Sequence, residues 1–265
     1  MSDPVSEAVA DPDRTTDAAF AKYAAAGAYH WQAIGRHPIW HHAFTAERYR
    51  LTLRSSGSLE GLRVLDYGCG DGALLGLICG AVGDAGKAHG FDPNRDGLRF
   101  ARMMLDQRRL PATLWSESSE LPEGYFDRII CAEVIEHVHD VPGLLAQFDA
   151  CLAPGGTAIV TTPVRLTETP GDPNHVREWF PEEFRRLFDD GPFEVMRHET
   201  AIPAAAAEVY YWRPWLFLRL PVFRVLCNLL SIAGVDALRW LKLRPNLPMQ
   251  QLVLLRRREP RPDAS

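Results

Sequence analysis

A glycine-rich turn near residue 68 is the first segment whose residue types indicate chemistry. Gly68, Gly70 and Gly72 occupy every second position shortly after the apolar residues Val64 and Leu65. Glycine lets the backbone turn tightly, and it lets a ligand lie directly on the main chain at the carboxyl end of a strand. The turn therefore indicates a binding site for a nucleoside-type ligand.

Two other interpretations of this turn stay open. Gly68, Gly70 and Ala73 also match the glycine pattern of dinucleotide-binding proteins. A tight turn of the same composition can also form without binding any ligand. The glycines by themselves are weak evidence, so the residues that follow must decide between these interpretations.

Two acidic residues follow the next two apolar stretches of the chain. Asp92 lies twenty residues after Gly72, and Glu117 follows the stretch that ends at Trp115. A carboxylate after a second strand can accept hydrogen bonds from both hydroxyls of a ribose, and one after a third strand can face the amino edge of an adenine. Either acid alone is typical of a solvated strand end. Their successive placement favours the nucleoside site.

Short apolar runs that alternate with amphipathic stretches must position these residues. This alternation is typical of βαβ units around a parallel sheet. Strands are predicted at residues 63–66, 87–91, 112–115, 128–132 and 157–161, and helices at residues 72–81, 96–105, 141–152 and 181–188. Two further strands are predicted at residues 193–197 and 250–255, which departs from a simple doubly wound sheet.

At this point the chain resembles the class I S-adenosylmethionine-dependent methyltransferases over residues 61–189, with fainter agreement to residue 255. The matching segments are DYGCGDG at 66–72, the acid Asp92, FDRIICAE at 126–133 and LAPGGT at 152–157. Asp66 stands two residues before Gly68, where nicotinamide enzymes usually carry a small or apolar residue. The whole set therefore favours the methyltransferases over dinucleotide-binding proteins.

The resemblance implies an α/β fold with a Rossmann-like, seven-stranded, mostly parallel sheet, an antiparallel last strand and helices on both faces. It also implies S-adenosyl-L-methionine as the cofactor. The residues that we expect to contact this cofactor are Asp66, Tyr67, Gly68, Gly70, Gly72, Asp92, Pro93, Glu117, Ser118 and Glu133.

The polar segment at residues 133–140 holds the candidates for catalysis. The sulfonium methyl group is already electrophilic, so the protein mainly has to hold an acceptor in line and remove its proton. We expect His137 to be the general base because imidazole titrates near neutral pH, with Glu136 or Asp140 orienting it. The alternative is that this segment is only a polar loop and helix cap.

A metal site is a further alternative for the same segment. Glu133, Glu136, His137 and the later His175 resemble the metal ligands of the small-RNA terminal 2′-O-methyltransferases, and a similar glutamate-histidine run occurs in the ubiquinone-pathway O-methyltransferases. Two carboxylates and two imidazoles can bind a divalent ion that clamps vicinal hydroxyls. Such clusters also form by capping and ion pairing, so no metal is predicted.

The segment at residues 213–261 combines ten basic and two acidic residues with many apolar side chains. This mixture is typical of a helix that lies in an anionic membrane interface. A lid over the site, or ordinary packing against the sheet or another subunit, explains the same pattern. We therefore expect a membrane contact through residues 212–243, with these alternatives left open.

Composition restricts the class of protein and its surroundings. The 265 residues carry a net charge of −5, which argues against a general nucleic-acid coat. Five scattered cysteines without a C-x-x-C pair favour a reducing cytoplasm, and no apolar run reaches the ~18 residues that a transmembrane helix needs. We expect a disordered lead-in at 1–17, a helical cover at 18–60, and a methyltransferase domain at 61–265 with an apolar basic insertion at 204–246.

These observations predict an S-adenosylmethionine-dependent enzyme that methylates an oxygen of a small or lipid-linked acceptor. The expected partner is a small molecule, the expected location is the cytoplasm with membrane association, and a nucleic-acid partner is not expected. Two alternatives remain, namely methylation of an RNA 3′ end and a cofactor-binding protein without catalysis.

Overall fold

A seven-stranded sheet forms the centre of the computed structural model, which describes residues 22–211, 222–235, 238 and 247–258. Its strands follow the order β3-β2-β1-β4-β5-β7-β6. They are β1 (Arg63–Tyr67), β2 (Lys87–Phe91), β3 (Ala112–Trp115), β4 (Phe126–Ala132), β5 (Leu152–Pro163), β6 (Phe193–Pro203) and β7 (Pro248–Arg257). This element order confirms the predicted Rossmann-like α/β fold.

The first five strands pair in parallel, and β7 runs antiparallel to both of its neighbours, β5 and β6. Strands β2 and β3 occupy their predicted residues. Strand β5 begins earlier than predicted, because Leu152 is already extended and pairs with Phe126 of β4 instead of ending the preceding helix. The late strand pair in the sequence is thus the β6–β7 edge of one mixed sheet.

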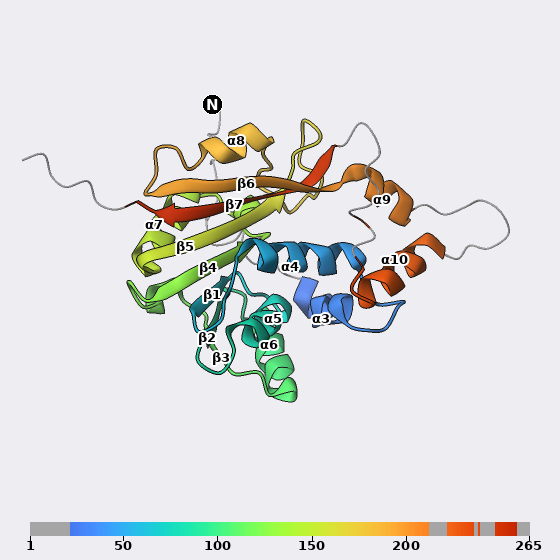
Figure 1. Cartoon of the computed structure of the whole chain (residues 1–265), viewed down its shortest axis with the longest axis horizontal. Helices are drawn as coiled ribbons and strands as arrows, with labels where there is room; N and C mark the ends of the chain where they lie inside the picture. The colour runs from blue at the N-terminus through green and yellow to red at the C-terminus, as the bar shows by residue number, and fades with distance from the viewer. Residues whose placement is uncertain (1–21, 212–221, 236–237, 239–246, 259–265) are drawn as a thin grey trace, which may run out of the picture.

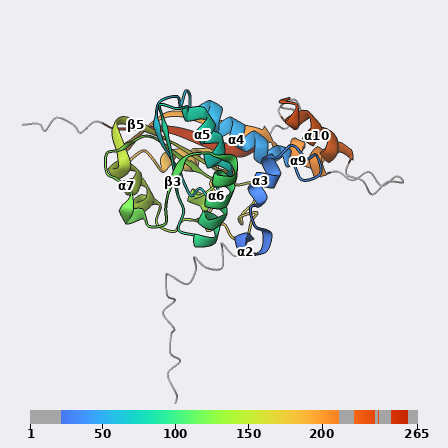
Figure 2. The same ribbon diagram turned by 90° about the horizontal axis from the view of Figure 1, so that it is seen from below.

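Helices cover both faces of this sheet (Figure 1 and Figure 2). One buried cluster joins the sheet to Leu51, Ile78 and Leu105, and the other joins it to Phe148 and Phe184. The helices of the first face are α4 (Ala43–Ser55), α5 (Ala73–Val82) and α6 (Arg95–Arg108); those of the second are α7 (Val141–Cys151) and α8 (Pro181–Arg186). Two short helices, α2 (Lys22–Ala26) and α3 (Tyr29–Ile34), precede α4.

The described part of the predicted insertion contains α9 (Ala204–Tyr211) and α10 (Val222–Ile232), at one end of the molecule (Figure 1). Asn228 joins α10 to the loop before α4. Its Nδ2 donates to the carbonyl oxygens of Pro38 and His41, and its Oδ1 accepts from Tyr210 Oη and from the amide of Ala43. Because a buried amide with all these partners is costly to displace, α9, α10 and the start of α4 form one unit, the α9–α10 unit.

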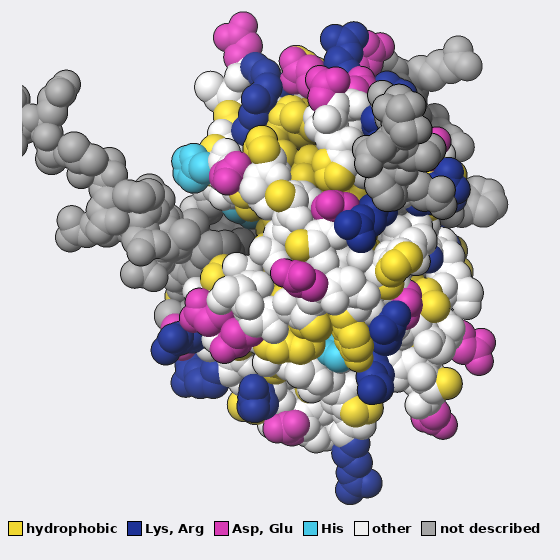
Figure 3. Space-filling view, turned by 90° about the vertical axis from the view of Figure 1, so that its left-hand side faces the viewer, with side chains coloured by type: hydrophobic (Ala, Val, Ile, Leu, Met, Phe, Trp, Pro, Cys, Tyr) yellow, Lys and Arg dark blue, Asp and Glu magenta, His cyan; other side chains and the backbone are white. Residues whose placement is uncertain are grey.

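Some sequence predictions fall on residues outside the described ones. These are the whole lead-in at 1–17, the start of the helical cover at 18–60, and about half of both the insertion at 204–246 and the membrane segment at 212–243. Within the residues that the structure describes, no helix is long and apolar enough to span a bilayer. On the described part of the face at the opposite end from α10, Lys and Arg side chains are interspersed with Asp and Glu (Figure 3).

Candidate active site

A cavity of about 1030 Å³ opens at the carboxyl edge of the sheet. The last residues of β1, β2, β4 and β5 all line it, namely Tyr67, Phe91, Ala132 and Pro163. In an open α/β sheet, ligands bind in the crevice outside the carboxyl ends of the strands. The cavity therefore lies where the fold places a ligand, and it is large enough for a nucleoside and a second molecule.

Seven of the ten residues predicted to contact the cofactor line this cavity. They are Asp66, Tyr67, Gly68, Asp92, Pro93, Ser118 and Glu133. Gly70 and Gly72 lie behind the lining. A Cβ at Gly70 would come within 2.0 Å of Tyr23 Oη, and one at Gly72 within 2.9 Å of the Ala101 Cβ. These two glycines permit close packing of the turn against its neighbours.

Asp92 is buried and already accepts two main-chain hydrogen bonds. Its Oδ2 accepts from the Gly70 amide at 2.7 Å, and its Oδ1 accepts from the Asn94 amide at 2.8 Å. The carboxylate thus fixes the glycine-rich turn to the start of α6. Each carboxylate oxygen can accept a second hydrogen bond, so the group can still bind the hydroxyls of a ribose.

Glu117 does not occupy the position that the sequence predicted. It is not among the residues that line the cavity; its side chain is exposed and faces Arg95 at 3.8 Å. The reason is local, because a short 3-10 helix begins at Ser118 and brings that residue to the cavity instead.

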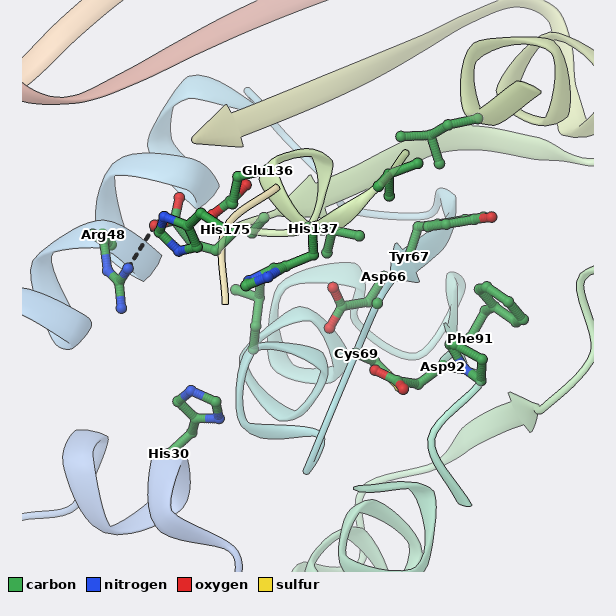
Figure 4. A pocket seen from close by; sticks show the side chains of 18 of the residues that line it. His30, Arg48, Asp66, Tyr67, Cys69, Phe91, Asp92, Glu136, His137 and His175 are labelled. Carbon is green, nitrogen blue, oxygen red and sulfur yellow. Dashed lines mark hydrogen bonds and ion pairs between the residues drawn. The ribbon is translucent and has the colours of Figure 1, made fainter. Parts of the chain in front are cut away.

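Glu133 lines the cavity, but its carboxylate is held by the protein. Oε2 accepts from Arg48 Nη1 at 2.6 Å, and Oε1 accepts from Thr161 Oγ1 at 2.9 Å and from Gln250 Nε2 at 2.5 Å. The predicted contact between Glu133 and the cofactor stays a prediction, and within the protein this carboxylate has a structural role. It joins α4 to β5 and β7, and it presents Arg48 to the cavity (Figure 4).

Asp66 has an unusual ionisation. Burial, together with the nearby charges of Asp92 and Asp71, raises the pKa of this carboxyl to about 8. Its Oδ2 has no hydrogen-bond partner among the described residues, although it lines the cavity. A cationic group bound beside Asp66 would favour its ionised form.

Glu136, His137 and His175 come together on the other side of the cavity (Figure 4). One ligand atom from each lies within 4.8 Å of the others. His137 Nδ1 bonds to the Asn174 carbonyl at 2.9 Å, and His175 Nδ1 bonds to Glu178 Oε1 at 2.6 Å. The second bond leaves Nε2 of His175 as the nitrogen that can face a ligand.

The same cluster fits a divalent ion on chemical grounds. Burial raises the pKa of Glu136 well above its ordinary value, and its Oε1 lacks a hydrogen-bond partner among the described residues. A cation would satisfy this oxygen together with two imidazole nitrogens, which is a donor set that transition metals accept. Of the four ligands considered from the sequence, Glu133 lies outside this group.

The helical cover predicted at 18–60 brings Tyr29, His30 and Trp40 to the cavity, from a stretch before the first strand that is rich in aromatic and histidine residues. Arg48 of α4 was not predicted, and among the described residues it is the one Arg or Lys side chain that lines the cavity. No motif marks them, because they reach the cavity through the packing of α3 and α4 on the glycine-rich turn. The only available signal was the density of aromatic and histidine residues before the first strand.

Comparison with known proteins agrees with this geometry. Residues 39–213 match a family model described as a methyltransferase domain. A ubiquinone biosynthesis O-methyltransferase of Bradyrhizobium diazoefficiens is 31% identical over 169 residues, which are 58% of this chain and 65% of that protein. The protein of the same name from Rhodopseudomonas palustris strain BisA53 is 32% identical over 171 residues, which are 59% and 66% of the two chains. The chain thus spans just under two thirds of these relatives.

A solved structure supports the fold. The crystal structure of a S-adenosylmethionine-dependent methyltransferase from Aquifex aeolicus has a TM-score of 0.51 and 22% identity, and the match covers 58% of this chain and 83% of that one. The matched family segment is more than half of this chain and contains the glycine-rich turn, the Asp92 strand end and the Glu136 cluster. This chain therefore belongs to the methyltransferase-domain family, within the class I S-adenosylmethionine-dependent methyltransferases.

Proposed function

We propose that this protein transfers the methyl group of S-adenosylmethionine to a hydroxyl oxygen of a small, lipid-linked acceptor. The observation that carries the proposal is one cavity with two different walls. The turn-side wall holds Asp66 and Asp92, and the facing wall holds Glu136, His137 and His175. The first wall suits a cationic nucleoside, and the second suits the oxygen atoms of an acceptor. The names of the two relatives favour an O-methyl product.

The cofactor has a complementary partner for each polar part. Asp92 suits the ribose hydroxyls, as the sequence predicts. Arg48 suits the carboxylate of the methionine part, since an arginine binds carboxylates by charge-assisted hydrogen bonds. Asp66 suits the ammonium group, because a nearby cation stabilises its ionised form.

The acceptor would lie against Glu136, His137 and His175. These residues can bind a hydroxyl oxygen directly, with His137 as the candidate for proton removal that the sequence suggests. If a divalent ion occupies the cluster, these three residues would hold it and the ion would polarise the acceptor oxygens. The buried Glu136 oxygen without a described partner is the feature that supports either interpretation.

We also propose a peripheral membrane contact through the α9–α10 unit. Val222, Leu226 and Leu229 lie three to four residues apart on one face of α10, and each is about half exposed at 49–51%. The opposite face is fixed to the protein through Asn228. Trp40, which lines the cavity, is 62% exposed and lies in the loop that Asn228 holds. An acceptor with an apolar tail would then reach the cavity from the bilayer surface.

A labelled-methyl assay tests the activity. The protein is incubated with S-adenosylmethionine that carries a labelled methyl group and with 3-pentadecylcatechol in detergent micelles, a probe that has vicinal hydroxyls and an apolar chain. We expect label in the catechol and none in a short RNA with a free 3′ end. Label in the RNA alone would favour the RNA alternative, and cofactor binding without transfer to any acceptor would favour the non-catalytic one.

The same assay with a chelator tests the ion. If activity falls with EDTA and returns with an added divalent transition metal such as Mn²⁺ or Zn²⁺, the cluster holds a divalent ion during the reaction. Unchanged activity in EDTA would agree with the sequence-based expectation of no metal and would leave His137 and His175 as direct ligands of the acceptor.

A further inference from the structure

Five histidines line the cavity, and most of them are committed to other contacts. They are His30, His42, His137, His139 and His175. His137 and His175 belong to the cluster with Glu136. His42 uses both ring nitrogens, because Nδ1 caps α4 at the Thr45 amide and Nε2 bonds to Tyr211 Oη at 3.1 Å. Burial also lowers the pKa of His42 to about 4. His139 is exposed, two residues beyond His137.

His30 differs because a buried carboxylate holds it. Its Nδ1 lies 3.3 Å from Asp71 Oδ1, and its main-chain amide donates to Asp71 Oδ2 at 2.9 Å. The next residue, Trp31, donates from its indole nitrogen to the Asp71 carbonyl at 2.7 Å. Three contacts to one residue of the glycine-rich turn therefore fix both the position of α3 and the direction of the His30 ring.

The ring of His30 projects from α3 toward the cavity (Figure 4). No described residue bonds to its Nε2. Tyr29 and Tyr49 pack beside the ring, with centroid distances of 4.0 and 6.4 Å, and Tyr23 lies at 6.3 Å. The Asp71 side chain is buried, which strengthens its electrostatic interaction with the imidazole.

The neighbouring carboxylate gives His30 the properties of a base. A carboxylate beside Nδ1 favours the tautomer with the proton on that nitrogen, so the lone pair of Nε2 is available to a ligand. His137 Nδ1, in contrast, bonds to a neutral main-chain carbonyl.

We propose that His30, oriented by Asp71, is the base that removes the proton of the acceptor hydroxyl. The proposal rests on the O-methylation proposed above. As the acceptor oxygen forms its bond to the methyl carbon, its proton moves to His30 Nε2. The carbon–sulfur bond breaks and its electron pair stays on sulfur, which becomes a neutral thioether. Asp71 remains ionised, and the imidazolium later loses its proton to water.

Chemical rescue separates the two candidate bases. His30→Ala and His137→Ala are assayed with 3-pentadecylcatechol, with and without added imidazole. Removal of the base should lower kcat about 10²–10⁴-fold. We expect imidazole to restore part of the kcat of His30→Ala and none of that of His137→Ala. Rescue of His137→Ala alone, or a His30→Ala variant with the kcat of the unmodified protein, would overturn the proposal.

Two further variants distinguish a base from a merely structural residue. Asp71→Asn keeps the shape of the side chain and should lower kcat. The double variant with His30→Ala should have the same kcat as His30→Ala alone. His37→Ala changes an exposed histidine that does not line the cavity, and it should keep full activity. Calorimetry with S-adenosylmethionine should give similar affinities for the unmodified protein and His30→Ala. A loss of cofactor affinity that accounts for the whole loss of activity would contradict a role in proton removal.

A measurement on the unmodified protein is independent of the acceptor. Nitrogen-15 NMR of the histidine rings reports which nitrogen carries the proton, and the His30→Ala spectrum assigns the signal. We expect the proton of the neutral His30 ring on Nδ1. A proton on Nε2 would overturn the proposal. If the protein binds S-adenosylmethionine but does not methylate the catechol, the proposed acceptor class fails, and the tautomer still tests the His30–Asp71 pair by itself.

Discussion

Arg48 Nη1 and Glu133 Oε2 lie 2.6 Å apart and join the N-terminal helices to the carboxyl edge of the sheet. Glu133 has a φ of 59°, in the left-handed region that residues other than glycine rarely adopt. Such a conformation persists only where surrounding contacts determine it, and three donors to one carboxylate meet that condition. The pair therefore fixes the place where the cofactor wall and the acceptor wall meet.

Replacement of Arg48 should affect both stability and cofactor binding. Arg48→Ala leaves the Glu133 carboxylate without its cationic partner, which should cost about 1–3 kcal/mol of unfolding free energy. The affinity for S-adenosylmethionine should fall as well, because the variant removes the one Arg or Lys among the described residues that line the cavity. Urea unfolding and calorimetry measure the two effects. Arg36→Ala, an exposed arginine outside the cavity, is the matched control and should change neither.

Much of the scaffold could be predicted because local patterns determine it. Strands β2 and β3 appear at their predicted residues, since short apolar runs bounded by turn residues have few alternatives in a parallel sheet. The exact start of β5 could not be predicted, because it depends on the pairing of Leu152 with Phe126 across the sheet. No local pattern records such a pairing.

The site was most predictable where a motif lies at a strand end. Asp66, Gly68 and Asp92 line the cavity because the ends of β1 and β2 must lie there in this fold. Arg48 and His30 come from helices that pack on the turn, and their contacts depend on tertiary structure alone. The sequence could show that residues 29–42 are rich in aromatic and histidine side chains, but not which of them face the ligand.

The ribose role of Asp92 can be tested by calorimetry. Asp92→Ala removes a carboxylate expected to bind two ribose hydroxyls, so binding of S-adenosylmethionine should weaken by about 1.5–3 kcal/mol. The variant also releases the Gly70 amide. Asp92→Asn keeps an oxygen for that amide and should retain part of the affinity. Unchanged affinity in both variants would rule out the ribose assignment.

Asp66 should couple cofactor binding to proton release. Its pKa of about 8 in the folded protein lies above the ordinary value of 3.8, so the folded state binds more protons than the unfolded state between these two values. The contribution of Asp66 to the unfolding free energy of the cofactor-free protein is therefore greatest below pH 4. It falls by up to about 1.4 kcal/mol per pH unit as the pH rises toward 8.

A bound ammonium group should lower the pKa of Asp66, because a nearby cation stabilises the ionised carboxylate. We expect S-adenosylmethionine to release a proton from Asp66 on binding near pH 7, and Asp66→Asn to abolish that release. Calorimetry in buffers of different ionisation enthalpy counts the protons. A binding enthalpy that is independent of the buffer in the unmodified protein would contradict the prediction.

His89 should make the protein sensitive to acid. It is buried on β2 against Trp115, and neither ring nitrogen has a hydrogen-bond partner among the described residues. Burial lowers its pKa from 6.5 to about 4, so between these values the unfolded state binds a proton that the folded state does not. Stability from this group is present above pH 6.5 and is lost as the pH falls toward 4.

Replacement of His89 by an apolar residue of similar size removes the loss of stability that this buried imidazole causes in acid. His89→Leu should therefore lose less stability than the unmodified protein between pH 6.5 and pH 4, as measured by thermal unfolding across that range. The exposed His37 provides the control, because His37→Leu should leave the pH dependence of the melting temperature unchanged. A His89→Leu variant with an unaltered pH profile would show that other groups control acid stability.

The proposed membrane contact predicts salt-sensitive binding to anionic vesicles. Apolar insertion of the α10 face and attraction between arginines and anionic lipid should act together, with about 1 kcal/mol from each basic residue near the surface. The protein should sediment with phosphatidylserine vesicles at low salt and less at high salt. Leu226→Glu with Leu229→Glu should abolish sedimentation, because it places two carboxylates on the exposed stripe. Met103→Glu, the same kind of change at an exposed position on α6, should have no effect. If the protein fails to sediment at either salt concentration, the α9–α10 unit does not bind membranes. The exposed apolar face of α10 would then need another explanation, such as packing against another part of the protein or another subunit.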